Sequence, residues 1–262
     1  MNFNLKQKKS LGQIFLTSQA IVNKIVVTAD IKDDEIVLEA GPGKGILTQA
    51  LLEKAGKVIS VEKDIKLLPF LREKFAKEIE KEKLILVYGD ILTFNFQFYK
   101  LNNYKIVANI PYYITGEFLR KTLSSYIQPN KMVLLIQKEV AERIARTKKE
   151  SILSISVKAY GEPKYIQTVK AGNFKPAPKV DSAILEINNI SKEFFIQINE
   201  KKFFEIVKAG FAHKRKFLIS NLGIFAEKEK LKLAFKQAGV SDTARAEDIA
   251  LEQWKILAQQ QQ

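Results

Sequence analysis

The sequence predicts an α/β fold, an open sheet with helices on both faces, followed by a small all-α domain. Short, nearly continuous apolar runs alternate with helical patterns over the first 188 residues, which is typical of βαβ units in a parallel sheet covered on both sides. After Asn188 only helical patterns follow. A chain of 262 residues is long enough for both parts. We therefore predict one domain at 1–188, which begins with a basic N-terminal arm, and a second at 189–262.

The predicted strands are apolar runs that end at glycine or at polar residues. We expect strands at Ile36–Ala40, Lys57–Glu62, Leu84–Tyr88, Lys105–Asn109, Met132–Gln137, Tyr165–Val169 and Val180–Ile187. Apolar residues at helical spacing predict helices after Ser18, after Gly45, over Asp64–Lys83, near Gly116, and at 203–211, 231–237 and 249–257. Because the carboxyl ends of parallel strands share one edge of a sheet, the side chains that follow successive strands are expected to converge there.

Composition limits the classes of function. The formal net charge of +14 and the pI of about 9.6 indicate a polyanionic partner such as nucleic acid, and the alternative is a solubilising, lysine-rich surface. No stretch approaches the ~18 apolar residues that cross a bilayer, so no membrane partner is expected. The chain has one histidine and no cysteine. This disfavours zinc sites and histidine triads and fits the reducing cytoplasm, so we expect no metal and a cytoplasmic location.

Three features at successive strand ends indicate a cofactor that contains a nucleoside. The sequence GPGKG at Gly41–Gly45 follows the first strand, where glycines such as Gly41 and Gly43 let the backbone approach a ligand. Glu62 ends the second strand, and a carboxylate in that position accepts hydrogen bonds from ribose hydroxyls. Asp90 follows the third strand and can accept from an adenine amino group. Each feature alone also fits a tight turn or a solvated acid, but together they converge on one crevice.

The sequence Asn-Ile-Pro-Tyr at Asn109–Tyr112 follows the fourth strand and indicates an acceptor site for an aryl amine. The Asn109 side-chain oxygen and the Ile110 carbonyl can accept hydrogen bonds from the two amine hydrogens and localise its lone pair toward an electrophile. Pro111 fixes the turn, and Tyr112 offers a face on which an extruded base can stack. A proline turn with a buried tyrosine is the alternative.

A second aromatic residue is a candidate for the same acceptor site. Two prolines constrain the loop at Phe174–Ser182, and the loop presents Phe174 as a possible opposite face of a base sandwich. The alternative is a hydrophobic plug between the sheet and the small domain. The residues alone favour neither.

An ordered set of motifs resembles the ribosomal RNA small-subunit adenine dimethyltransferase family nearly from end to end. The segments that carry the resemblance are Lys8–Gln13 with Phe15 and Leu16, Leu38–Gly43, Val61–Asp64, Gly89 with Asp90, Asn109–Tyr112, Gln137–Arg143, Phe174–Ser182 and Ala244–Glu247. One such motif would be weak evidence, whereas the ordered set is specific.

The resemblance implies a Rossmann-like methyltransferase domain with a small helical domain, and S-adenosyl-L-methionine as the methyl donor. It implies dimethylation of the exocyclic amines of two adjacent adenosines near the 3′ end of small-subunit rRNA, on a precursor of the small ribosomal subunit. We expect the enzyme to act as a monomer. By position in the motifs, the cofactor contacts would be Ile14, Leu16, Gly41, Gly43, Glu62, Asp90 and Asn109, and the acceptor site would comprise Asn109, Ile110, Pro111, Tyr112 and Phe174. The family usually has Asn or His at the position of Ile14, so only a backbone contact to the cofactor is expected there.

Three alternative functions also fit parts of the sequence. The first is methylation of a large-subunit rRNA adenine, of the macrolide-resistance type, which the Phe174 loop and the helical tail disfavour. The second is a non-catalytic assembly or RNA-binding factor on the same fold, which the intact Asn109–Tyr112 segment disfavours. The third is a nicotinamide-dependent oxidoreductase. It is disfavoured because Ile46 stands where the dinucleotide fingerprint requires a third glycine.

Overall fold

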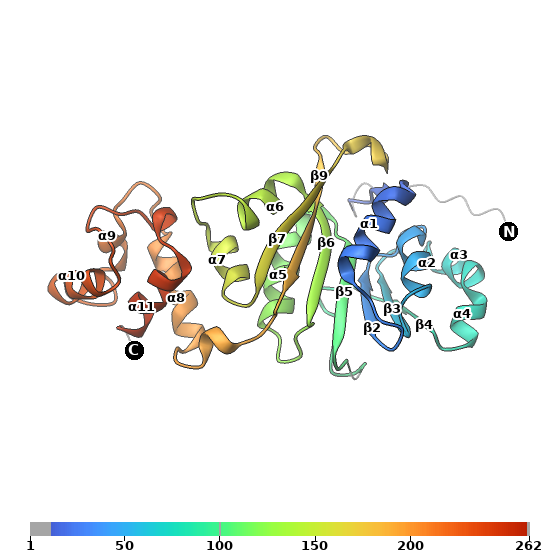
Figure 1. Ribbon diagram of the computed structural model, residues 1–262, viewed down its shortest axis with the longest axis horizontal. Helices are drawn as coiled ribbons and strands as arrows, with labels where there is room; N and C mark the ends of the chain where they lie inside the picture. The colour runs from blue at the N-terminus through green and yellow to red at the C-terminus, as the bar shows by residue number, and fades with distance from the viewer. Residues whose placement is uncertain (1–11, 100, 261–262) are drawn as a thin grey trace. The chain divides into compact units, whose positions relative to one another are not determined.

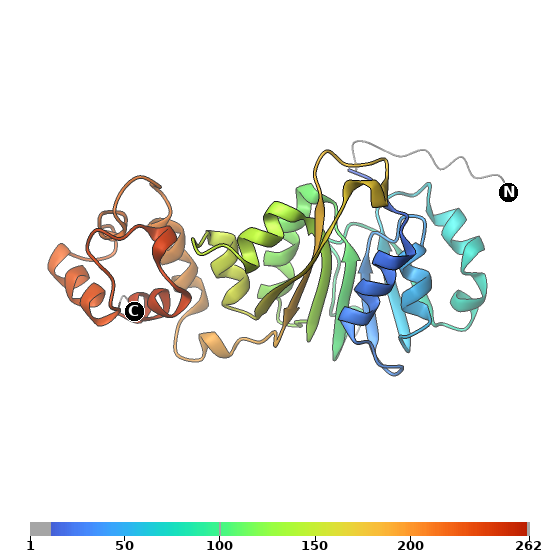
Figure 2. The ribbon, with the colours of Figure 1, turned by 45° about the horizontal axis from the view of Figure 1, so that its top comes forward.

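The computed structural model describes residues 12–99 and 101–260, and the chain divides into two compact units (Figures 1 and 2). The first unit extends through Ala141 and includes Pro163–Ile190, and the second combines Glu142–Glu162 with the chain from Ser191 onward. The predicted basic N-terminal arm lies, up to residue 11, outside the described residues. None of the helices in the described residues has the length and apolar composition needed to span a bilayer.

A seven-stranded sheet forms the centre of the first unit, with the strand order β4-β3-β2-β5-β6-β9-β7. The strands are β2 (Ile36–Ala40), β3 (Lys57–Glu62), β4 (Leu84–Tyr88), β5 (Tyr104–Asn109), β6 (Lys131–Gln137), β7 (Glu162–Val169) and β9 (Ser182–Asn188). The five strands from β4 to β6 are parallel, whereas β9 is antiparallel to β6. All seven predicted strands are present, and the sheet is mixed rather than purely parallel.

Helices cover both faces of this sheet (Figures 1 and 2), which explains why its strands are nearly continuous apolar runs. They are α1 (Gln19–Ala29), α2 (Ile46–Leu52), α3 (Leu68–Lys74), α4 (Ala76–Glu80), α5 (Thr115–Ser124) and the start of α6 (Lys138–Ala145). The single helix predicted over Asp64–Lys83 is wrong, because the chain leaves helical geometry at Phe75 (φ −113°, ψ 27°). The Phe75 side chain is buried, with its ring against Gly45.

A second, two-stranded sheet joins distant parts of the first unit and was not predicted. Strand β1 (Phe15–Leu16) pairs antiparallel with β8 (Phe174–Lys175), so that Leu16 lies opposite Phe174. We refer to Gly12–Leu16 as the N-terminal strap. Two-residue strands carry too little pattern to be recognised in a sequence, and their pairing here spans more than 150 residues.

The second unit is helical within the described residues. It contains the end of α6, then α7 (Ile152–Lys158), α8 (Glu200–Gly210), α9 (Leu218–Leu222), α10 (Lys228–Gln237) and α11 (Leu251–Gln259). Its core surrounds Trp254 and Phe203, which are fully buried. Helix α7 was not predicted, and it lies before residue 188, within the range predicted for the first domain. Its buried residues Ile155 and Ala159 instead belong to the apolar core of the second unit. This packing explains why the segment Glu142–Glu162 is part of the second unit.

Candidate functional site

An open cavity lies in the first unit at the carboxyl ends of β2, β3, β4 and β5. The register explains the convergence, because Ala40 lies beside Val61, and Glu62 lies beside Tyr88, in parallel strands. All the predicted site residues except Phe174 line this cavity. They are Ile14, Leu16, Gly41, Gly43, Glu62, Asp90, Asn109, Ile110, Pro111 and Tyr112.

The turn after β2 exposes bare backbone to the cavity. Gly41 has a φ of +72°, a conformation that L side chains rarely adopt, and no heavy atom lies within 4 Å of the position that a Cβ would occupy. Its N–H donates to the Val61 carbonyl over 2.9 Å, which ties the turn to β3. A Cβ on Gly43 would approach the Phe15 ring to 3.0 Å, so that glycine lets the strap pack closely over the turn.

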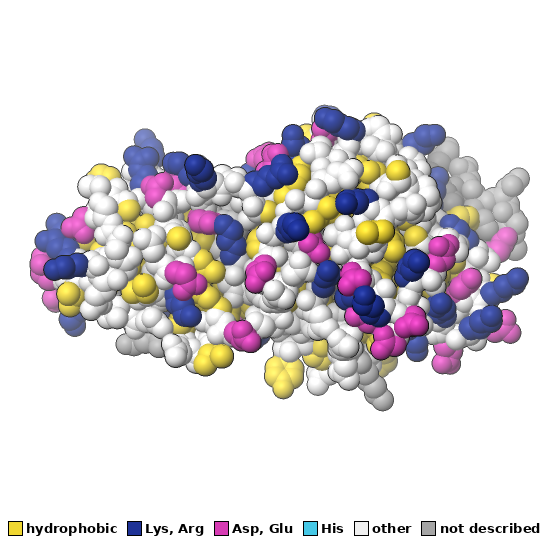
Figure 3. Space-filling view, viewed as in Figure 1, with side chains coloured by type: hydrophobic (Ala, Val, Ile, Leu, Met, Phe, Trp, Pro, Cys, Tyr) yellow, Lys and Arg dark blue, Asp and Glu magenta, His cyan; other side chains and the backbone are white. Residues whose placement is uncertain are grey.

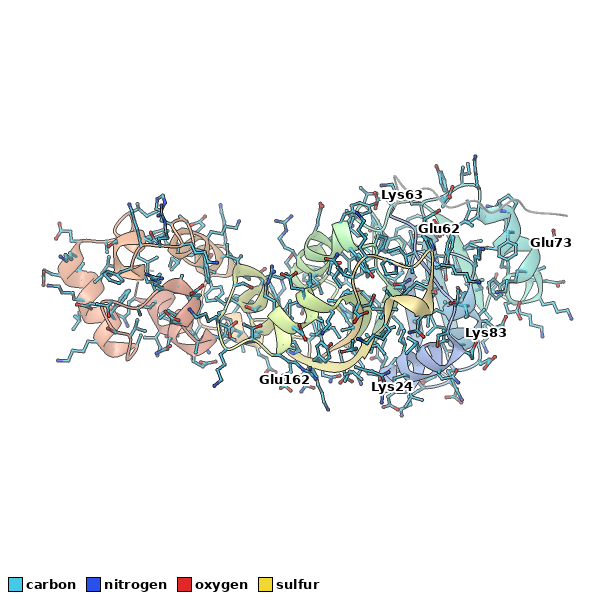
Figure 4. All side chains as sticks on the ribbon, turned by 90° about the horizontal axis from the view of Figure 1, so that it is seen from above. Lys24, Glu62, Lys63, Glu73, Lys83 and Glu162 are labelled. Carbon is cyan, nitrogen blue, oxygen red and sulfur yellow. The ribbon has the colours of Figure 1, made fainter. Side chains whose placement is uncertain are left out.

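Glu62 is a buried carboxylate at the end of β3, with a relative exposure of 5%. Its Oε1 accepts a hydrogen bond from the Asp64 N–H over 2.7 Å, and its Oε2 accepts a longer one from the Gly43 N–H over 3.3 Å. Burial raises the pKa of Glu62, and these backbone donors oppose the rise. Figure 4 shows Glu62 near Lys63, at the edge of the sheet where the cavity lies. The side chain is thus fixed by backbone donors and presented to the cavity.

Asp90 forms another part of the cavity wall and begins the loop after β4 and Gly89. Its Oδ1 accepts from the Leu92 N–H over 2.9 Å, and its Oδ2 accepts from the Lys63 ammonium over 2.6 Å. Partial burial favours the neutral acid, but the hydrogen bonds from Lys63 and from the Leu92 N–H outweigh burial and lower the pKa of Asp90. Asp90 is therefore a carboxylate at neutral pH.

The Asn109 side chain is oriented by the N-terminal strap. Its Nδ2 donates to the carbonyl oxygen of Ile14 over 3.1 Å, and this acceptor requires the amide nitrogen, rather than the oxygen, to point at Ile14. Among the described residues, no group donates to Asn109 Oδ1. Ile110 is buried and its N–H donates to the Leu135 carbonyl over 3.1 Å, which fixes the backbone beside Asn109. The site therefore holds an oriented amide oxygen as a hydrogen-bond acceptor.

Tyr112 lies at the cavity with its ring half-buried. Its hydroxyl shares a 2.7 Å hydrogen bond with Ser182 Oγ, at the start of β9, and burial raises the pKa of the phenol. Pro111 precedes the short 3-10 turn Tyr112–Ile114 at φ −55° and ψ 131°, so the proline sets the direction in which the tyrosine leaves the strand. Tyr112 is neutral at physiological pH and is available as a flat surface.

The structure does not bring Phe174 to the cavity. Its side chain is only 3% exposed and belongs to the apolar core that also contains Phe15, Leu16 and Val169. The reason is the pairing of β8 with β1, which turns this part of the loop into the core rather than toward the ligand. This packing within the first unit matches neither of the two alternatives, an exposed face for a base or a plug between the sheet and the small domain.

Several residues of the cavity were not predicted as site residues, among them Glu39 and Gln13. Glu39 is 1% exposed; its Oε2 accepts from Thr48 Oγ1 over 2.7 Å and from Ser60 Oγ over 2.6 Å, while Oε1 has no hydrogen-bond partner among the described residues. Burial raises its pKa to about 7. The position of Glu39 inside an apolar strand was the feature of the sequence that could have indicated a functional role. Gln13, whose Nε2 donates to Asp64 over 2.9 Å, carried no comparable signal.

The described residues contain no group of three or more His, Cys, Asp or Glu side chains that could hold a metal ion. On the face shown in Figure 3, Lys and Arg side chains are spread among Asp and Glu rather than gathered into one patch. The cavity itself offers oriented hydrogen-bonding groups, which are carboxylates, bare backbone and the Asn109 amide.

Comparisons with known proteins agree with this geometry. Residues 4–261 match the family described as ribosomal RNA adenine dimethylase. The chain is 40% identical over 260 residues to ribosomal RNA small subunit methyltransferase A of Dehalococcoides mccartyi, covering 97% of this chain and 88% of the relative. It is 39% identical to the protein of the same name from Fusobacterium nucleatum, covering 95% of each chain.

Two solved structures resemble both units of the fold. The 23S rRNA methyltransferase ErmE has a TM-score of 0.76 and 27% identity, covering 94% of this chain and 98% of that one. A dimethyladenosine transferase from Plasmodium falciparum has a TM-score of 0.76 and 25% identity, covering 93% and 95%. The fold class predicted from the sequence is confirmed, and so is the predicted resemblance: the chain belongs to the ribosomal RNA adenine dimethylase family.

Proposed function

We propose that this enzyme transfers methyl groups from S-adenosyl-L-methionine to the exocyclic amines of two adjacent adenosines near the 3′ end of small-subunit rRNA, during assembly of the small subunit. The observation that carries the proposal is the orientation of Asn109. The Ile14 carbonyl holds its Nδ2, so its Oδ1 is directed as an acceptor in the same cavity as Glu62 and Asp90. A site for an amine thus adjoins a site for a nucleoside.

The cavity fits this methyl donor. Glu62 would accept from the ribose hydroxyls, and Asp90 would accept from the adenine amino group. The open space beside Gly41, which a Cβ would fill, leaves room for the ligand to lie against the backbone. Glu39 Oε1 is a buried acceptor without a partner among the described residues, and the ammonium group of the donor would satisfy it. When bound, the donor supplies a methyl group on a sulfonium, which is an electrophile.

The residues of this chain activate the amine rather than deprotonate it. The lone pair of an adenine amine is delocalised into the ring, which makes the nitrogen a poor nucleophile. Asn109 Oδ1 and the Ile110 carbonyl would accept hydrogen bonds from its two N–H groups, which localises the lone pair and directs it at the methyl carbon. With the donor bound, the nitrogen–carbon bond would form as the carbon–sulfur bond broke, and the sulfur would leave as a thioether. The alkylated nitrogen then loses its proton to water, since an aryl ammonium is acidic, and a second round follows after cofactor exchange.

The names of the relatives favour the small subunit as substrate. The curated relatives at 34–40% identity are called ribosomal RNA small subunit methyltransferase A, whereas the large-subunit enzyme ErmE is similar at 27%. In our proposal the protein acts on the rRNA as a monomer, without a metal and in the cytoplasm. Unchanged activity in a metal chelator and the mass of a single chain in sedimentation are the expected results.

The test is labelled methyl transfer to purified ribosomal subunits that lack the modification, followed by mapping of the modified nucleotides. The expected result is four methyl groups per small subunit, two on each of two adjacent adenosines near the 3′ end. Methylation of the large subunit, with none on the small subunit, would show that the proposed substrate is incorrect. RNA binding without methyl incorporation would instead support a non-catalytic assembly factor.

A further inference from the structure

The ammonium group of Lys121 lies in the middle of the loop that begins with Asp90. Lys121 is on α5, the helix that follows the Asn109–Tyr112 segment, and is partly buried. Its Nζ donates to three backbone carbonyls, those of Leu92 over 2.6 Å, Phe94 over 2.9 Å and Ile91 over 3.3 Å. We call residues 90–96 the adenine loop.

This arrangement uses the full donor capacity of an ammonium group on one short loop. The loop also turns back on itself, because the Thr93 N–H and hydroxyl both donate to the Asp90 carbonyl, over 3.0 and 3.2 Å. The same ammonium lies 5.3 Å from the centre of the Phe96 ring, within cation–π range. Burial lowers the pKa of Lys121, although the nearby carboxylates of Asp90 and Glu117 oppose this. The fold therefore holds this cation at a partly desolvated position, unlike a lysine on the surface, whose ammonium group is hydrated.

The adenine loop contributes directly to the cavity. Asp90 and Ile91 both line it, and Ile91 is buried. The carbonyls of Ile91, Leu92 and Phe94 point to one place, and without Lys121 they would have to turn toward water or toward other donors. That rearrangement would move Asp90 relative to Glu62, which is held separately by the Gly43 and Asp64 N–H groups.

We propose that Lys121 is a positioning residue that determines selectivity for the adenine base of the cofactor by holding the adenine loop, and hence Asp90, in place. The inference rests on the proposed function, because it assumes that Asp90 accepts from the adenine amino group. Helix α5 would then have two roles. Its beginning follows the amine-acceptor segment Asn109–Tyr112, and Lys121 near its end holds the adenine loop.

The test compares two ligands that differ at the adenine amino group. Calorimetry measures binding of S-adenosyl-L-homocysteine and of its hypoxanthine analogue, S-inosyl-L-homocysteine, to the full-length protein. A hydrogen bond from the amino group to a carboxylate is worth about a tenfold preference for the adenine compound, and we expect the unaltered protein to show it. In Lys121→Met the preference should fall to about twofold or less, and binding of the adenine compound should weaken about tenfold.

Controls separate this role from a general effect on folding. Arg120→Met removes a cation from the neighbouring, exposed position of the same helix and should leave both affinities unchanged. Lys121→Arg keeps a cation with several donors and should retain part of the preference. If Lys121→Met does not fold, Lys121→Gln, which keeps a donor, supplies the same comparison.

The outcomes distinguish the two proposals. If the unaltered protein binds the adenine compound with the expected preference but Lys121→Met or Lys121→Gln keeps that preference, the role of Lys121 is wrong and the proposed function stands. A uniform loss of affinity for both ligands would also overturn the role, because it would show a structural effect without selectivity. If the unaltered protein binds neither compound, the proposed cofactor itself is wrong.

Discussion

The amide nitrogen of Asn109 donates a 3.1 Å hydrogen bond to the carbonyl oxygen of Ile14, across 95 positions of the sequence. This bond links the N-terminal strap to the end of β5 and fixes which atom of the Asn109 side chain faces the cavity. The acceptor is a backbone carbonyl, so this bond does not depend on which side chain stands at position 14. The Ile14 side chain packs against the apolar core instead.

Asn109 is expected to be essential for methyl transfer. Asn109→Ala removes the acceptor and should lower the transfer rate at least ~100-fold, the cost of losing one preorganised hydrogen-bonding group at a reacting atom. Asn109→Asp should also fail, because a carboxylate keeps an acceptor but cannot donate to the Ile14 carbonyl. Rates are measured with labelled cofactor on unmodified small subunits, and thermal unfolding serves as the control for the fold. Near-normal turnover of Asn109→Ala would exclude this role.

The Tyr112 ring and its hydroxyl are expected to contribute separately. Tyr112→Ala removes the stacking surface and should weaken the apparent affinity for the small subunit by ~10–100-fold, since stacking of one base is worth about 1–3 kcal/mol. Tyr112→Phe keeps the ring and loses only the bond to Ser182, so we expect a decrease of about fivefold. Ser182→Ala breaks the same bond from the other side and should match Tyr112→Phe. Unequal effects of those two variants would mean that the hydroxyl has another role.

Glu39 should make the stability of the first unit depend on pH. Its pKa rises from 4.5 to about 7 in the folded protein because it is buried. Between these values the folded state holds a proton that the unfolded state has lost, so stability falls as pH rises through this window, by at most about 3 kcal/mol. Glu39→Gln lacks the titrating group. Urea unfolding at pH 5, 6, 7 and 8 should therefore show a steeper decline for the unaltered protein, and parallel curves would contradict the assignment.

Gly210 is expected to be needed for packing in the second unit. A Cβ at this position would lie 2.3 Å from the Trp254 ring and 2.8 Å from Leu218 Cδ1, so Gly210→Ala should destabilise the unit by about 1–3 kcal/mol. Gly223→Ala is the matched control, because its nearest neighbour would be 3.5 Å away and its φ of −57° suits alanine. Trp254 is the only tryptophan, so its fluorescence reports thermal unfolding of this unit. Equal midpoints for the two variants would refute the prediction.

Much of the site could be predicted because parallel strands bring residues that follow separate apolar runs to the same edge of the sheet. Glu62, Asp90 and Asn109 each end or follow an apolar run, and the parallel pairing of β2 to β5 brings them to one edge. No detailed contact had to be known for that conclusion. The same reasoning could not place Phe174, because the direction of its side chain depends on pairing with Leu16, which no local pattern records.

The sequence by itself determined the seven strands of the main sheet, the residues at the strand ends and, through the ordered motifs, the family. These features follow from the periodicity of apolar residues and from short-range spacing, both of which can be read directly from the sequence. Only the tertiary structure decided that the Ile14 carbonyl orients Asn109, that Lys121 holds the adenine loop, that α7 belongs with the C-terminal helices and that Phe174 lies in the core. Each of these depends on a hydrogen bond or an apolar contact between residues distant in sequence, and such contacts exist only once the chain has folded.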